Sequence, residues 1–127
     1  RLAAIQSLAQ YYKNVSQVFE LLKQILQADH DRLARIESGK MLIKYFSDIP
    51  EVFQLLYESV INDPFQRKTN QQLNPREVLL EEMTKEYKSH PEFLELVRNR
   101  AIRDDDEQLR KWAQEQLQQL ANQGGSS

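Results

Sequence analysis

Cysteine is absent from this sequence, and glycine and proline are scarce. Only three glycines and four prolines occur among 127 residues. Without cysteine the chain has no disulfide framework and no thiolate metal site, so we expect it to reside in the reducing cytoplasm. Two glycines are among the last four residues, and Gly39 is the only internal one. A glycine-rich phosphate-binding loop is therefore excluded, and helices are favoured along the chain.

Long apolar runs and a strong net charge are also missing. No apolar stretch approaches the roughly 18 residues of a membrane span, and no signal peptide is recognisable. The formal net charge is -2, which gives no overall attraction to a polyanion. We therefore expect neither a membrane nor nucleic acid as the partner. Because the sequence begins at Arg1 within a helical pattern, we expect it to be part of a longer protein.

Apolar residues recur at the three-to-four spacing of amphipathic helices, interrupted by short turns. Pairs of such stretches, separated by two or three residues, predict helical hairpins. The second helices match closely, because Val18-Phe19-Glu20-Leu21-Leu22 corresponds to Val52-Phe53-Gln54-Leu55-Leu56. A hairpin has more apolar surface than its two helices can hide from each other, so the hairpins are expected to stack. Gly39, inside a first helix, predicts a close approach between helices.

An aspartate at the end of each second helix and an arginine after it mark a repeat. Asp29 and Arg35 are six residues apart, and so are Asp104 and Arg110. The spacings are 34, 41 and 34 residues along the series Arg1, Arg35, Arg76 and Arg110. We interpret this pattern as a 34-residue repeat with a seven-residue insertion within the polar segment 64–75. We expect this segment to be a solvated loop whose length has little effect on stability.

The aspartate–arginine step between paired helices resembles that of the HEAT repeat family. In that family the aspartate bonds to backbone and to an arginine of a neighbouring repeat, which gives a ladder along the stack. The resemblance implies that the structural ladder consists of Asp29, Asp63, Asp104, Arg1, Arg35, Arg76 and Arg110. It also implies an all-α fold, a right-handed α-solenoid of about three and a half HEAT-like helical hairpins with seven helices.

Two segments are more narrowly similar to the C-terminal HEAT-like repeats of bacterial, especially cyanobacterial, NACHT-type signalling nucleoside triphosphatases. They are Ala4-x3-Leu8-Ala9-x2-Tyr12-Lys13 and the run from Tyr87 to Ala101. The nucleotide-binding motifs of those proteins are absent from this sequence. We therefore expect a single HEAT-like domain at 1–122, with the loop 64–75 inserted in it, and a flexible tail at 123–127.

The outward side chains of the second helices are the predicted partner-binding surface, since second helices line the concave side of HEAT-like stacks. These residues are Glu20, Lys23, Gln27, Gln54, Tyr57, Glu58, Glu95, Arg98 and Asn99. A mixed polar surface with one aromatic suits a protein partner better than DNA. We predict a non-enzymatic protein-interaction module, the sensor or scaffold arm of a larger multidomain protein of NACHT type. Its partners would be another protein and the remainder of the parent chain.

An alternative site is the basic pair Arg67 and Lys68 in the inserted loop, close to Arg76. Such a cluster can hold a phosphate or an acidic ligand. The alternative function is therefore a helical repeat that binds nucleic acid or an acidic ligand through this loop. The competing interpretation is a solvated loop without a binding function.

Residues suited to catalysis or metal binding do not form a recognisable pattern. The acidic run 104–107 lacks the alternating ligands and the central glycine of a helical calcium loop, so we interpret it as a cluster at a helix start. His30 and His90 lack a metal-ligand spacing, and no nucleophile elbow is present. We predict no catalytic residue, no metal and no cofactor.

Overall fold

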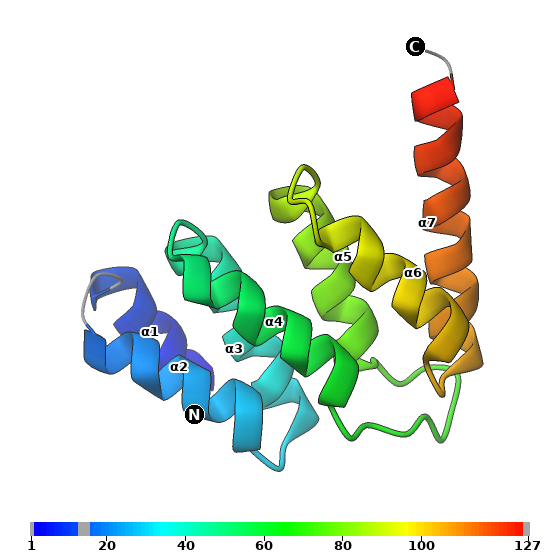
Figure 1. Ribbon diagram of the computed structural model, residues 1–127. Coiled ribbons are helices and arrows are strands. Elements are labelled where there is room, and N and C mark those ends of the chain that lie inside the picture. Colours follow the sequence, from blue (N-terminus) through cyan, green and yellow to red (C-terminus); the bar gives the residue numbers. More distant parts are fainter. Residues whose placement is uncertain (1, 13–15, 126–127) are drawn as a thin grey trace.

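The computed structural model describes residues 2–12 and 16–125 of the chain, and within these ranges it has seven helices and no strand (Figure 1). The all-α prediction is therefore confirmed for the described residues. The helices are α1 Leu2–Tyr12, α2 Ser16–Ala28, α3 Arg32–Phe46, α4 Pro50–Asn62, α5 Pro75–Tyr87, α6 Phe93–Arg103 and α7 Glu107–Gly125.

Short-range chemistry accounts for several helix starts. The Asp31 carboxylate accepts a hydrogen bond from the Leu33 N–H at 3.0 Å before α3. Asn74 does the same before α5, accepting from the Arg76 N–H at 2.9 Å. Such caps satisfy backbone donors that have no partner within the helix. Pro50 opens α4 and Pro75 opens α5, positions where the missing proline N–H costs nothing.

The helices pack as successive pairs. The contacts between α1 and α3 and between α3 and α5 join the first helices of neighbouring pairs. Each second helix also packs on the first helix that follows it, α2 on α3, α4 on α5 and α6 on α7. Figure 1 shows α2, α4 and α6 in front of α1, α3 and α5, with α7 standing at the far end. This order leaves one side of α2, α4 and α6 for solvent.

One apolar core runs through the helices. The second helices contribute Leu22, Leu56 and Leu96, and the first helices contribute Leu42 and Leu80; all five side chains are fully buried. Burying a leucine side chain stabilises a fold by about 1.5–3 kcal/mol relative to exposure. The matched apolar positions of the repeat therefore supply the cohesion between pairs as well as within them.

Gly39 lies where α3 meets α5, as its position inside a helix predicts. A Cβ atom at this position would overlap the side chain of Leu79, which is fully buried on α5. Glycine in a helix interior costs about 1 kcal/mol relative to alanine. The close packing of α3 on α5 offsets that cost.

The ends of the helices differ in detail from the predicted boundaries. Helix α5 begins at Pro75, so the segment between α4 and α5 is 63–74. Helix α7 continues through Gly125, so residues 123–125, which we expected in a flexible tail, are helical. Arg1 and the last two residues lie outside the described part of the chain. None of the described helices is long and apolar enough to cross a membrane.

Candidate partner-binding face and the arginine ladder

Arg35 joins the ends of two successive second helices. Its Nη1 donates to the backbone carbonyls of Asp29, at 2.9 Å, and His30, at 3.3 Å. Its Nε and Nη2 donate to the two carboxylate oxygens of Asp63 at 2.6 and 3.0 Å. Both side chains are buried. The guanidinium therefore links the turn after α2 to the end of α4 by charge-assisted bonds in a bidentate geometry.

Arg76 makes the same set of contacts one pair further on. Its Nη1 donates to the carbonyls of Asp63, at 2.8 Å, and Phe65, at 2.9 Å. Its Nε and Nη2 donate to the Asp104 carboxylate at 2.8 and 2.9 Å. In both pairs the arginine and the aspartate are 28 residues apart. The insertion therefore lies between Asp63 and Arg76 and leaves the bond pattern unchanged.

The two outer members of the predicted ladder are less complete in the described residues. Arg110 Nη1 donates to the Asp104 carbonyl at 2.5 Å, which is the backbone half of the pattern. The carboxylate of Asp29 accepts from the N–H of Asp31 at 2.8 Å. Arg1, the predicted partner of Asp29, lies outside the described residues. Arg35 and Arg76 are thus the two positions where both halves of the ladder can be followed.

Asp104 carries more positive neighbours than Asp63. Besides the two bonds from Arg76, it accepts from Arg100 Nη1 at 3.1 Å and from the Asp106 N–H at 2.9 Å. Its side chain has 0% exposure. Burial opposes ionisation, but the bonds from Arg76, the Asp106 N–H and Arg100 outweigh it, and the pKa of Asp104 lies below its usual range. Two guanidinium groups therefore share a single ionised carboxylate.

The inserted segment is anchored to the start of α7 and is not simply solvated. Arg67, whose side chain is 12% exposed, donates to the Asp106 carboxylate at 2.8–3.1 Å and to the Gln72 carbonyl at 2.6 Å. Asn74 Nδ2 donates to the same carboxylate at 2.8 Å, and Phe65 is buried. The expectation of a solvated loop is wrong at these positions, because apolar burial and charge-assisted bonds hold the segment at both ends.

The two basic residues of the loop, Arg67 and Lys68, therefore have different environments. The hydrogen bond from Arg67 to Asp106 is the main reason that the pKa of this guanidinium is raised. Asp106 compensates the charge of Arg67, and the Glu77 carboxylate also lies 3.8 Å from Arg67 Nη2. Lys68 is exposed, and within the part of the chain that the structure describes its Nζ has no partner. One free cation, rather than two, remains at the predicted alternative site.

The predicted binding face lies on the solvent side of α2, α4 and α6, and we call it the second-helix face. The exposed members of the predicted set are Glu20, Gln27, Gln54, Glu58, Glu95 and Arg98, and the half-buried members are Lys23, Tyr57 and Asn99. Lys23 Nζ bonds to Glu51 of α4 at 2.8 Å, a residue missing from the prediction. Glu51 lies in the first turn of α4. The sequence predicted only a favourable helix-start acid there, and not its contact with α2.

Tyr57 lies near the middle of this face on an aromatic base. Its ring centroid is 6.1 Å from that of Phe53, which in turn stacks on His90 at 3.6 Å and meets Tyr87 at 5.2 Å. Burial is the main cause that raises the pKa of Tyr87 to about 12. The cluster joins α4 to the turn between α5 and α6. A side chain held in this way is available to a partner at small entropic cost.

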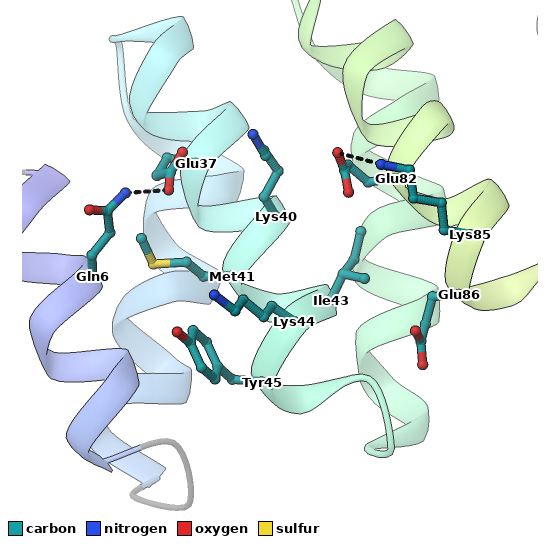
Figure 2. Close-up of a pocket in the computed structure, with 10 residues that line it drawn as sticks. All are labelled: Gln6, Glu37, Lys40, Met41, Ile43, Lys44, Tyr45, Glu82, Lys85 and Glu86. Carbon is teal, nitrogen blue, oxygen red and sulfur yellow. Dashed lines mark hydrogen bonds and ion pairs between the residues drawn. The ribbon is translucent and has the colours of Figure 1, made fainter.

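A second surface, on the first helices, was missing from the prediction. A cleft of about 650 Å³ lies between α1, α3 and α5, and Met41, Ile43 and Tyr45 are among its lining residues (Figure 2). Lys40 and Lys44 are one turn apart on α3; Lys44 Nζ lies over the Tyr45 ring, 5.2 Å from its centroid, and Glu82 of α5 is on the other side of the cleft (Figure 2). The i, i+4 spacing of the lysines was a visible signal. The resemblance pointed to the second helices as the binding surface, so this spacing on a first helix was not interpreted as a site.

The acidic run at the start of α7 is used within the fold. Asp104 belongs to the ladder, and Asp106 accepts from Arg67, Asn74 and the Gln108 N–H. Burial opposes ionisation of Asp106 too, but the Arg67 and Asn74 bonds prevail and keep its pKa below the usual range. Among the described residues, no group of three or more His, Cys, Asp or Glu side chains could hold a metal ion.

Three comparisons place this geometry against known proteins. The chain matches no family model, no curated protein and no solved structure.

Proposed function

We propose that this chain is a HEAT-like α-solenoid whose second-helix face binds a protein partner without catalysis. In this proposal the second-helix face is concave and the arginine ladder fixes the stacking of the repeats. The parent protein would be a larger multidomain protein of NACHT type, with this segment as its sensor or scaffold arm. The NACHT assignment rests on the sequence resemblance alone.

The exposed second-helix face is the observation that carries the proposal. Its charges are mixed, since Glu20 and Glu58 lie near Lys23 whereas Arg98 lies on α6. Arg98 has no partner among the described side chains, and Tyr57 supplies a fixed aromatic surface. Interfaces combine such an aromatic anchor with a polar rim.

The alternative, nucleic-acid or acidic-ligand binding through Arg67 and Lys68, gains no support from the loop. Arg67 is committed to Asp106 and its removal would disturb the fold. A single lysine gives weak, salt-sensitive attraction to a phosphate backbone. The loop is better explained as a structural connection between α4 and α7.

A site-specific photo-crosslinker tests the proposal. p-Benzoylphenylalanine replaces Tyr57 on the second-helix face or Tyr45 in the first-helix cleft, and each protein is irradiated in an extract of the source cells. We expect one discrete crosslinked protein from position 57 and none from position 45. Equal labelling from both positions, or labelling from position 45 alone, would contradict the assignment of the face.

Charge reversal supplies the matched control. Glu95→Lys with Arg98→Glu alters two exposed residues of the second-helix face, and Lys44→Glu with Glu86→Lys alters two exposed residues of the first-helix face. The first pair should remove the crosslink and the second should leave it. Because all four side chains are exposed, both variants should keep the thermal midpoint of the parent chain within a few degrees.

A further inference from the structure

The chain departs from its repeat at two places, directly after α4 and at the end of α6. Residues of α6 correspond to residues of α4 that lie 41 positions earlier, so Arg100 stands in the place of Ser59 and Arg103 in the place of Asn62. The insertion also enters the chain directly after α4. The ladder needs neither added arginine, because Arg35 holds Asp63 without such neighbours. Two independent departures from the repeat therefore coincide at one location.

These departures line a common cleft. It has a volume of about 500 Å³ and lies between the end of α4, the start of the inserted segment and the end of α6. Ile61, Phe65, Arg76, Arg100, Arg103 and Asp105 are among its lining residues. Ile61 and Phe65 provide an apolar part and the arginines a positive part. The cleft can thus accept a group that carries both an apolar side chain and an anion.

The charges of the cleft leave a small positive excess. Three guanidinium groups line the cleft, those of Arg76, Arg100 and Arg103, together with the carboxylates of Asp63 and Asp105. Their ion-pair partners behind the lining, Arg35 and Asp104, cancel each other's charge. Arg100 shares Asp104 with Arg76, and its other bonds within the described chain go to the side chain of its neighbour Asn99, at 2.6 and 2.9 Å. Arg103 is exposed, and no described residue pairs with it. A single carboxylate from outside would balance this excess.

An exposed apolar side chain, Ile102, lies next to Arg103 in the sequence but does not itself line the cleft. Ile102 precedes Arg103 on the last turn of α6 and is 76% exposed, the largest value among the exposed large apolar residues of the described chain. Its counterpart on α4 is Ile61, which is half-buried at the cleft. By helical spacing, Ile102 continues the row of Arg98 and Asn99 on the second-helix face. Ile102 therefore extends that face to the last turn of α6, the turn from which Arg103 enters the lining of the cleft.

We infer that this cleft binds a short acidic segment of a partner protein, in which a carboxylate meets Arg103 and Arg100 in the cleft and neighbouring apolar side chains pack on Ile61 within it and on the exposed Ile102 of the second-helix face. The inference rests on the proposed function, because it names the chemistry of the partner at the α6 end of the same face. A nucleic acid fits less well, because one excess positive charge binds a polyphosphate weakly. A peptide carboxylate needs one charge-assisted contact with a guanidinium.

Selection from a phage-displayed library of short random peptides tests the inference. The immobilised full chain is the target, and selected peptides are synthesised with a fluorescent label for binding by anisotropy. We expect selected peptides to share an aspartate or glutamate next to a large apolar residue. The variant Ile102→Ser with Arg103→Glu should bind them roughly tenfold more weakly or worse, as expected when an interface anchor is lost.

The matched control changes an equivalent pair elsewhere. Lys68→Glu with Leu73→Ser also alters one exposed cation and one exposed apolar residue, since Lys68 is exposed and Leu73 is 53% exposed. Affinity should be unchanged in this variant. Both double variants alter exposed side chains only, so their thermal midpoints should match that of the parent chain.

The remaining outcomes separate the two proposals. If the peptides lose affinity only in the Glu95→Lys, Arg98→Glu variant, the second-helix face still binds protein but the acidic-segment site is wrong. Failure to select any acidic, apolar peptide overturns the inference, and the crosslink at position 57 then decides the proposed function separately. Tighter binding of a labelled single-stranded RNA than of the peptides, lost with Arg103→Glu, would also overturn it in favour of a nucleic acid.

Discussion

The α2–α3 and α4–α5 junctions are held by equivalent arginine–aspartate contacts, although they differ in length. Three residues, 29–31, join α2 to α3, whereas the longer segment 63–74 joins α4 to α5. In each case an arginine spans from the carbonyl of the preceding aspartate to the carboxylate of the next. Arg35 is the fourth residue of its helix and Arg76 the second. The position of the guanidinium is therefore maintained while the helix start shifts.

The longer junction needs supports that the short one lacks. Asn74 caps α5, Phe65 is buried and Arg67 bonds to Asp106 at the start of α7. In the short junction Asp31 alone caps α3. An inserted loop loses conformational entropy when it is ordered, and these contacts offset that loss. The comparison predicts that the two junctions respond differently to matched substitutions.

The largest expected effect is at the short junction. Among the described residues, Arg35 is the only arginine bonded to the Asp63 carboxylate, so Arg35→Ala should lower the free energy of unfolding by about 3–5 kcal/mol. Arg76→Ala should cost less, because Arg100 remains on Asp104. Urea unfolding of both variants measures the difference. A larger loss for Arg76→Ala would show that Arg100 does not compensate for its neighbour.

The loop anchor gives an intermediate effect. Arg67→Met keeps most of the side-chain volume but removes the bonds to Asp106 and to the Gln72 carbonyl, so we expect a loss of about 1.5–3 kcal/mol. Lys68→Met, at the exposed neighbour, should change the free energy of unfolding by less than about 0.5 kcal/mol. Equal changes in the free energy of unfolding for the two variants would contradict the anchoring of Arg67 and support a solvated loop.

Acid should weaken the long junction through Asp104 and Asp106. The pKa values of both carboxyls are lowered in the folded chain, despite burial, by their arginine and amide donors. Their contribution to stability is therefore complete above their unfolded pKa, near pH 4, and is lost as the pH falls through the lower folded values. Asp106→Asn should lose less stability than the parent between about pH 5 and pH 2. If the free energy of unfolding of the variant and of the parent depended on pH identically, Asp106 would not contribute to the acid sensitivity.

The smallest effect concerns Glu77 on α5. Burial raises the pKa of Glu77, Glu81 adds to the shift, and Arg67 opposes it. A carboxyl with a raised pKa stabilises the fold below its unfolded pKa and loses that contribution as the pH rises through the folded value. Glu77→Gln should therefore raise the free energy of unfolding at neutral pH by up to about 1 kcal/mol. A loss of similar size would show that its 3.8 Å approach to Arg67 is stabilising.

Much of the helical framework could be read from the sequence because it follows from local periodicity and composition. The pairing of helices, the insertion between Asp63 and Arg76, and the close approach at Gly39 all had local signals. The anchoring of Arg67 did not, because Asp106 is 39 residues away and looks like an ordinary helix-start acid. The link from Lys23 to Glu51 was hidden for the same reason. Which exposed face binds a partner depends on the partner's surface, about which one chain's sequence holds little information.

A double-mutant cycle on Arg76 and Asp104 tests the central claim, that the ladder is maintained across the insertion. The variants Arg76→Ala, Asp104→Ala and the double substitution are unfolded in urea, beside the corresponding cycle on Arg35 and Asp63. We predict a coupling energy above about 1 kcal/mol for both pairs, larger for Arg35 and Asp63 because no second arginine of the described chain bonds to the Asp63 carboxylate. A coupling energy near zero for Arg76 and Asp104, beside a large one for Arg35 and Asp63, would show that the insertion breaks the ladder.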